Sequence, residues 1–128
     1  MRKAKGVVIV DIQKVYAIIV GVLLALAGVI GFVNNPIFGL FGVNTAQNIV
    51  HLVGGAMGIW LGIKGRGKAY NMWLGISSTI VAILGFIPLT ANLMLSIFGM
   101  NIAITVLHAA IAIASLGVAY GIREGTAQ

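Results

Sequence analysis

The sequence predicts an all-α membrane protein, a polytopic four-helix bundle made of two parallel two-helix repeats. All eight Lys and Arg residues lie near the start, in the middle or near the end of the chain. Between these places, residues 15–63 and 69–122 contain no Asp, Glu, Lys or Arg. One bilayer crossing needs only about 20 helical residues, so each of these segments must cross twice.

The composition supports one transmembrane domain over residues 1–128. The chain is 60% hydrophobic and 8% charged, whereas soluble domains carry about 25% charged residues. A net charge of +6 would suggest nucleic acid binding in a soluble protein. Here topology and attraction to anionic head groups explain the charge, so membrane lipids are the expected partners and nucleic acid is not. The chain has no cysteine, which excludes disulfides and thiolate metal sites.

The first repeat should form helices over about residues 12–33 and 44–63. The first helix ends before Pro36, because proline cannot continue a helix. The second begins at Asn44, a favourable N-cap residue, and Gln47 is placed to reach back as in a capping box.

The second repeat should form helices over about residues 69–87 and 101–122. Pro88 stops its first helix, and Asn101 starts its second helix as Asn44 does in the first repeat. The short basic segment 64–68 is the turn that joins the two repeats.

The two repeats, residues 12–63 and 69–122, share matching residues. Tyr16 and Gly21 recur 54 positions later as Tyr70 and Gly75. Both repeats begin on the same side, which predicts a pseudo-twofold axis along the membrane normal. The motif that follows the outer loop recurs 57 positions later, as Phe41-Gly42-Val43-Asn44 with His51 and then Phe98-Gly99-Met100-Asn101 with His108.

The position of the basic residues predicts the orientation. Lys and Arg are retained on the cytoplasmic side of a membrane. Both termini and the middle turn should therefore be cytoplasmic in a multi-pass protein of the cytoplasmic (inner) membrane. The uncharged loops, residues 34–43 and 88–100, should face outward.

Small residues follow one face of each helix. Because lipid gives helices no hydrophobic reason to associate, close backbone approach must provide the contact. The bundle should be tightly packed or should pack against another membrane protein or a copy of itself as a homo-oligomer. The predicted packing residues are Gly54, Gly55, Gly58 and Gly62 on the second helix and Ala112, Ser115 and Ala119 on the fourth.

Polar residues continue the same faces toward the outer side. They are Asn44, Asn48 and His51 on the second helix and Asn101, Thr105 and His108 on the fourth. The two histidines should lie at matching depth. Ionisable groups inside a bilayer are functional candidates, but neutral imidazoles also serve as polar packing groups. The cluster is therefore either a ligand or proton site or a structural one.

Specific chemistries fit this cluster poorly. Two histidines above the small residues Gly55 and Ala112 could hold a b-type haem, but the outer half has no basic partner for the propionates. A zinc site is incomplete, because both acidic residues lie at the inner ends of the helices. Ser115 is two turns from His108, beyond the reach of a nucleophile and its base. We therefore expect no enzyme, no metal and no cofactor.

The helix that begins at Asn44 resembles a known family. These are small bacterial and archaeal four-helix membrane proteins classed as a domain of unknown function. The resemblance rests on Asn44 followed seven residues later by His51, repeated in the second half, and on the glycine-rich continuation 54–58. After His108 the sequence is rich in alanine instead. The resemblance covers nearly the whole chain and implies the fold and a membrane location, with no activity.

The expected function is that of an accessory, scaffolding or self-assembling membrane component. The outer loops contain apolar segments, residues 37–41 and 93–98, where polar turn residues are usual. Such segments must be buried, and the longer second loop favours contact with a partner or another copy. The alternative is an ion or proton conduit, or a haem-binding electron-transfer protein, centred on His51 and His108.

The predicted topology is open to a direct test. Reporter fusions at residue 66 and at the C-terminus should give cytoplasmic signals, because the basic residues are retained inside. Fusions near residues 38 and 94 should give external signals. Mixed or reversed signals from these four fusions would contradict the topology.

Overall fold

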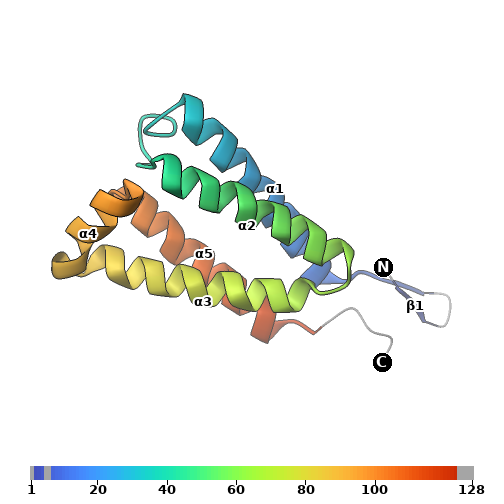
Figure 1. Cartoon of the computed structure of the whole chain (residues 1–128). Helices are drawn as coiled ribbons and strands as arrows, with labels where there is room; N and C mark the ends of the chain where they lie inside the picture. The colour runs from blue at the N-terminus through green and yellow to red at the C-terminus, as the bar shows by residue number, and fades with distance from the viewer. Residues whose placement is uncertain (1, 5–6, 124–128) are drawn as a thin grey trace.

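The structure, a computed structural model, describes residues 2–4 and 7–123. Four of its helices are long and apolar enough to cross a membrane. Figure 1 shows them as a bundle, with a fifth, shorter helix at one end. The predicted all-α membrane bundle is confirmed. The helices are α1 (Ile12–Val33), α2 (Thr45–Ile63), α3 (Gly67–Phe86), α4 (Pro88–Phe98) and α5 (Ile102–Gly121).

A short antiparallel ribbon precedes the bundle and was not predicted. Its strands are β1 (Arg2–Ala4) and β2 (Val7–Ile9). α1 then starts at Asp11, whose side chain accepts a hydrogen bond of 3.3 Å from the backbone N–H of Lys14. This carboxylate therefore acts as an N-cap.

The long helices lie within two residues of their predicted limits. Asn44 and Asn101 are N-caps, with side chains that accept from the backbone N–H of Gln47 and Ile104 at 3.0 and 3.1 Å. α3 begins at Gly67, two residues earlier than predicted. The cap residues fixed the starts of α2 and α5 well because their chemistry is local.

The second outer loop is a helix, which corrects the prediction of a loop over residues 88–100. Pro88 ends α3 and also begins α4, because the first turn of a helix leaves its N–H groups unpaired and proline has none to lose. Gly99 closes α4 with a left-handed φ of 67°. The prediction treated Pro88 only as a stop signal.

The helices pack in two close pairs, α1 with α2 and α3 with α5 (Figure 1). In the first pair the backbones touch at two glycines. A Cβ on Gly21 would lie 2.7 Å from the carbonyl oxygen of Gly55, and a Cβ on Gly55 would lie 2.5 Å from that of Gly21 and collide with the backbone of Ala25. Only glycine permits this crossing, as expected for helices packed in lipid.

The other predicted packing residues divide into two groups. Gly58 and Gly62 are buried, and Gly58 faces the ring of Tyr70. Gly54 differs, because a Cβ there would meet nothing within 4 Å. The residue does not belong to the packed stripe, and its place in the fold is described below. On α5, the predicted packing residues Ala112, Ser115 and Ala119 are all buried.

The bundle buries polar as well as apolar side chains and has an apolar exterior. Its largest fully buried side chains are Gln13, Asn71, Thr105 and Ser115. Large apolar side chains such as Leu23 and Val29 are exposed along the helices. This arrangement suits a bilayer, where buried polar groups pair inside the protein and apolar groups face lipid.

The two helix pairs are joined by hydrogen bonds between the middle of the bundle and the end that holds the α2–α3 turn. The Tyr16 hydroxyl lies 2.7 Å from the Ser115 hydroxyl, and the Tyr70 hydroxyl donates to the Gly54 carbonyl at 2.8 Å. Gln13 donates to the carbonyls of Val118 and Ile122 in α5, both at 2.7 Å. The pairs are thus linked by polar bonds between side chains and backbone.

Adjacent glycines provide a matched stability test. Gly55→Ala should lower the free energy of unfolding by about 1–3 kcal/mol, because its methyl group would collide with α1. Gly54→Ala should leave stability unchanged or raise it slightly, since its methyl group has open space and alanine favours helix. Denaturant titration in detergent measures both. Equal losses at the two positions would show that the crossing does not depend on Gly55.

Candidate functional site

Two asparagines hold the helix pairs together at the opposite end of the bundle, which we term the loop end. The Asn44 side chain donates to the Ile97 carbonyl at 2.8 Å, and the Asn101 side chain donates to the Leu40 carbonyl at 2.9 Å. Each acceptor lies four residues before the other asparagine. We call these two reciprocal bonds the asparagine clasp. Through it, Asn44 is bonded to the end of α4, and Asn101 is bonded to the loop between α1 and α2.

Glycines allow the two loops to meet within the clasp. A Cβ on Gly42 would lie 2.7 Å from the Gly99 carbonyl oxygen, and a Cβ on Gly99 would lie 2.8 Å from that of Val43. The Gly42 N–H donates to the Asn101 side chain at 2.9 Å. The repeated Phe-Gly-x-Asn motif therefore has a structural role, in which the glycines permit contact and the asparagines provide hydrogen bonds.

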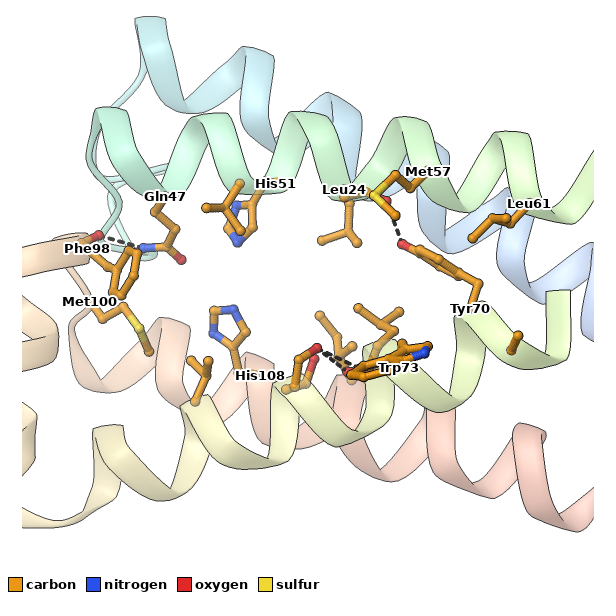
Figure 2. Close-up of a pocket in the computed structure, with 18 of the residues that line it drawn as sticks. Leu24, Gln47, His51, Met57, Leu61, Tyr70, Trp73, Phe98, Met100 and His108 are labelled. Carbon is orange, nitrogen blue, oxygen red and sulfur yellow. Dashed lines mark hydrogen bonds between the residues drawn. The ribbon is translucent and has the colours of Figure 1, made fainter. Parts of the chain in front are cut away.

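His51 and His108 face one another below the clasp. Their ring centroids are 5.8 Å apart and the ring planes are tilted by 38°. Figure 2 shows the two imidazoles extending from opposite walls, His51 from α2 and His108 from α5. The backbones of these two helices stay apart, since no Cα atom of α2 lies within 8 Å of a Cα atom of α5, so the contact is made by the two side chains. The matching depth predicted for the histidines is what the structure has.

Hydrogen bonding distinguishes the two imidazoles. His108 Nδ1 lies 2.9 Å from the Ile104 carbonyl oxygen. Because a carbonyl only accepts, Nδ1 must carry the proton, and Nε2 of the neutral ring keeps its lone pair. His51 is only 7% exposed, and its Nδ1 has no partner in the described part of the chain. The pair thus presents one oriented acceptor and one ring without a fixed tautomer.

Gln47 adds a further buried polar group beside the histidines. Its side-chain N–H donates to the Phe98 carbonyl at 2.7 Å and to the Gly42 carbonyl at 3.3 Å. It is therefore not bonded back to Asn44 as a capping box requires. Its Oε1 is buried and unpartnered within the described residues. This leaves an acceptor at the same end of the molecule as the histidine pair (Figure 2).

Asn48 and Thr105 do not join this cluster. A Cβ on Gly31 of α1 would collide with Asn48 Oδ1, and one on Gly85 of α3 would lie 2.6 Å from Thr105 Oγ1. The Thr105 hydroxyl donates to the Asn101 carbonyl at 2.9 Å. Both residues pack inside a helix pair, so the predicted six-residue cluster separates into clasp, packing and histidine positions.

A cavity of about 530 Å³ extends from the histidine pair along the bundle. α2 forms one wall, and α3 with α5 forms the other (Figure 2). Apolar side chains such as Leu24, Leu61 and Val81 form most of its lining. Gly54 also lines the cavity, which explains the open space at its Cβ position.

The two ends of the cavity differ in chemistry. His51, His108 and Gln47 line the loop end together with Phe98 and Met100. Arg66, Tyr70 and Trp73 line the opposite end. The cavity is thus apolar along most of its length, with a neutral polar end and a basic, aromatic end.

The small residues Gly55 and Ala112 do not form the space beside the histidines. Gly55 is packed against α1, and neither it nor Ala112 lines the cavity. Within the described residues there is no group of three or more His, Cys, Asp or Glu side chains able to hold a metal ion. Asp11, the one acidic residue in the described part, caps α1.

The sequence identified the histidines but missed most of the cavity. Gln47 was recognised only as a capping residue, and Met100 only as part of the repeated motif. Arg66 and Trp73 belong to a cluster of basic and aromatic residues near the middle turn. That pattern indicates an interface position but not which residues border a cavity.

A family model described as "Domain of unknown function (DUF4383)" matches residues 14–121. The chain belongs to this family. The matched range includes all the long helices except the first two residues of α1, so the histidine pair and the cavity lie inside the DUF4383 domain. The expected resemblance to an uncharacterised membrane family is confirmed. Neither the curated proteins nor the solved structures contain a match to the chain.

Proposed function

We propose that this DUF4383 protein is a non-enzymatic binding component of the cytoplasmic membrane that holds an elongated amphiphile in the cavity. The observation that carries the proposal is the 530 Å³ of space with apolar walls inside the membrane-spanning part of the bundle. Protein interiors are normally close-packed, so an apolar space of this size is available to apolar ligands. An acyl chain is the most abundant molecule of that shape in a bilayer.

The basic end of the cavity favours an anionic head group. Arg66 lines this end and is exposed, and none of the described residues forms an ion pair with it. Trp73 is exposed beside the same end, as is usual for tryptophan at head-group level. We therefore infer an anionic phospholipid, with its phosphate at Arg66 and one acyl chain extending toward the histidines.

The proposed orientation brings Arg66 to the cytoplasmic leaflet, where anionic lipids are concentrated. The basic residues near the start and in the middle of the chain support it, since cytoplasmic retention of Lys and Arg explains both groups of basic residues.

We also infer that the two halves arose by duplication. Tyr16 and Tyr70 each form a hydrogen bond with a helix of the other half, although with partners of different kinds, and the two clasp asparagines make matching bonds.

A non-enzymatic role is supported by how the polar residues are used. Ser115 is hydrogen-bonded to Tyr16, and Asp11 caps α1. Neither is beside a histidine as a nucleophile or acid would need to be. The remaining groups are suited to binding.

Filling the cavity tests the proposal. Gly54→Leu should abolish retention of a fluorescent phosphatidylglycerol by the purified protein, because its side chain would occupy the apolar space. Gly117→Leu is the matched control, since this helical glycine also has open space but lies outside the cavity. Lipid bound per chain is measured after gel filtration in detergent.

Two comparisons sharpen this test. Phosphatidylcholine with the same acyl chains should bind more weakly than phosphatidylglycerol, and Arg66→Gln should remove the difference. Equal lipid retention by Gly54→Leu and the wild type would place the lipid on the outer surface and reject the cavity as its site.

A second candidate role is self-assembly, as an accessory or scaffolding component. α4 carries the observation that favours it. Leu89 is 89% exposed, and Leu93, one turn later, is 55% exposed. The helix has no charged residue. Apolar residues gathered on a short helix at the loop end suit contact with the α4 of a second copy.

Charging this surface tests self-assembly. Leu89→Asp combined with Leu93→Asp should convert an oligomer to a monomer, because two buried carboxylates would be desolvated at the contact. Asn92→Asp is the control, because it adds a charge to the same helix at an exposed position that is already polar and is rotated by about 100° from Leu93, so it should leave the oligomer intact. Mass in detergent is the readout. A mass unchanged by the double substitution would assign α4 to the lipid head-group layer.

A further inference from the structure

We propose that His51 and His108 form a binding site for a soft monovalent metal ion, Cu(I), with the Met100 thioether as a third ligand. This site occupies the loop end of the cavity, away from the basic end assigned to a lipid phosphate. It goes beyond the proposed lipid binding and does not depend on it. The argument rests on ring geometry, the orientation of His108 and the charge of the surroundings.

The separation of the rings suits a bridging metal. With metal–nitrogen bonds of about 2.0 Å and ring nitrogens about 1.1 Å from their ring centres, a linear N–metal–N unit separates imidazole centroids by about 6.2 Å. The observed 5.8 Å corresponds to a moderately bent unit. A bent unit leaves room for a third, weaker ligand on its open side.

A shared proton fits the geometry less well. At a centroid distance of 5.8 Å, the nearest ring nitrogens are at least about 3.6 Å apart, beyond the 2.7–3.2 Å range of a direct hydrogen bond. The two rings accordingly make no hydrogen bond with one another, and both lie in the described residues. The gap is too wide for a proton shared directly between the rings, whereas two metal–nitrogen bonds of about 2.0 Å can span nitrogens up to about 4.0 Å apart.

His108 is already oriented as a ligand. Its Nδ1 donates to the Ile104 carbonyl at 2.9 Å, so Nε2 presents a lone pair. A backbone carbonyl bonded to the far ring nitrogen is the usual support of a metal-binding histidine, because it fixes the tautomer and the ring orientation. His51, whose Nδ1 is unpartnered, can adopt the tautomer that a metal requires.

The free side-chain oxygen of Gln47 at this end is an acceptor, which favours a cation over an anion. Gln47 is 3% exposed, and its buried Oε1 has no partner in the described part of the chain. It lines the same end of the cavity as both histidines. An unpaired buried acceptor is costly, and a nearby cation would offset that cost.

The absence of a nearby carboxylate limits the charge of the cation. All potential ligands here are neutral, and Asp11, the one acid in the described residues, is at the other end of the bundle. Burying a divalent ion without counter-charge is strongly unfavourable. Neutral imidazole and thioether ligands select Cu(I), which carries one charge and prefers soft donors.

Met100 is the methionine that lines the cavity at the histidine end, whereas Met57 lines it near Tyr70. Met100 is 5% exposed and lines the loop end of the cavity with the histidines. Met94 is also 5% exposed and belongs to the same apolar cluster, but it does not line the cavity. Met94 and Met100 are therefore a matched pair for substitution.

Copper binding tests the proposal. The purified protein is titrated with Cu(I) under anaerobic, reducing conditions against a colorimetric Cu(I) chelator. We expect one Cu(I) per chain. His51→Ala and His108→Ala should each weaken binding by at least about tenfold, since each removes one of two strong ligands. Met100→Leu should weaken binding less, and Met94→Leu should not change it.

Further measurements separate ligand loss from misfolding and from lipid binding. X-ray absorption of the wild-type complex should show nitrogen ligands at about 2.0 Å and a sulfur contribution that Met100→Leu removes. Arg66→Gln should keep the copper while losing preference for anionic lipid.

A wild-type chain that retains no copper, or a His51→Ala, His108→Ala double variant that retains it at wild-type affinity, would reject the site. A haem absorption band formed on adding hemin and lost in both histidine variants would reassign the pair to haem.

Discussion

The arrangement of the bundle depends on hydrogen bonds between two helix pairs that do not pack closely along their full length. Lipid provides no hydrophobic reason for α1–α2 to join α3–α5, so specific polar contacts must do so. At the loop end the asparagine clasp joins them, and toward the opposite end tyrosine and glutamine side chains do. α2 and α5 make no close backbone contact with one another, and the cavity lies between them.

Close packing and open space occur on the same helix, one residue apart. Gly55 touches the backbone of α1, whereas Gly54 faces the cavity. Successive residues of an α-helix are rotated by about 100°, so two neighbouring glycines can have different roles. The first allows a tight helix pair to form, and the second leaves one wall of the cavity without a side chain.

The sequence predicted the fold because its signals are local or additive. Uncharged length predicted the crossings, and Asn44 and Asn101 predicted the helix starts. The absence of charge correctly indicated that residues 88–100 are apolar, but it does not distinguish an apolar loop from the helix α4. Pro88 both ends α3 and begins α4, and only the first of these roles was predicted.

The candidate site was predicted less completely, because it depends on distances between helices. The spacing of His51 and His108 within their repeats predicted equal depth, and the structure brings them face to face. The same spacing grouped Asn48 with His51, although Asn48 packs on Gly31. A helical face spans enough of the circumference to contact two neighbours, and sequence periodicity does not tell which neighbour each residue meets.

The position of Gln47 links the cavity to α4. Both Asn44 and Gln47 donate to carbonyls at the end of α4, those of Ile97 and Phe98. Phe98 also lines the cavity, so α4 cannot leave the bundle without moving one of its walls. By thermodynamic reciprocity, any occupant that stabilises Phe98 in place also stabilises the docked position of α4, and any contact that holds α4 there favours the occupant equally. The side-chain amides of Asn44 and Gln47 therefore couple the position of α4 to the occupancy of the cavity.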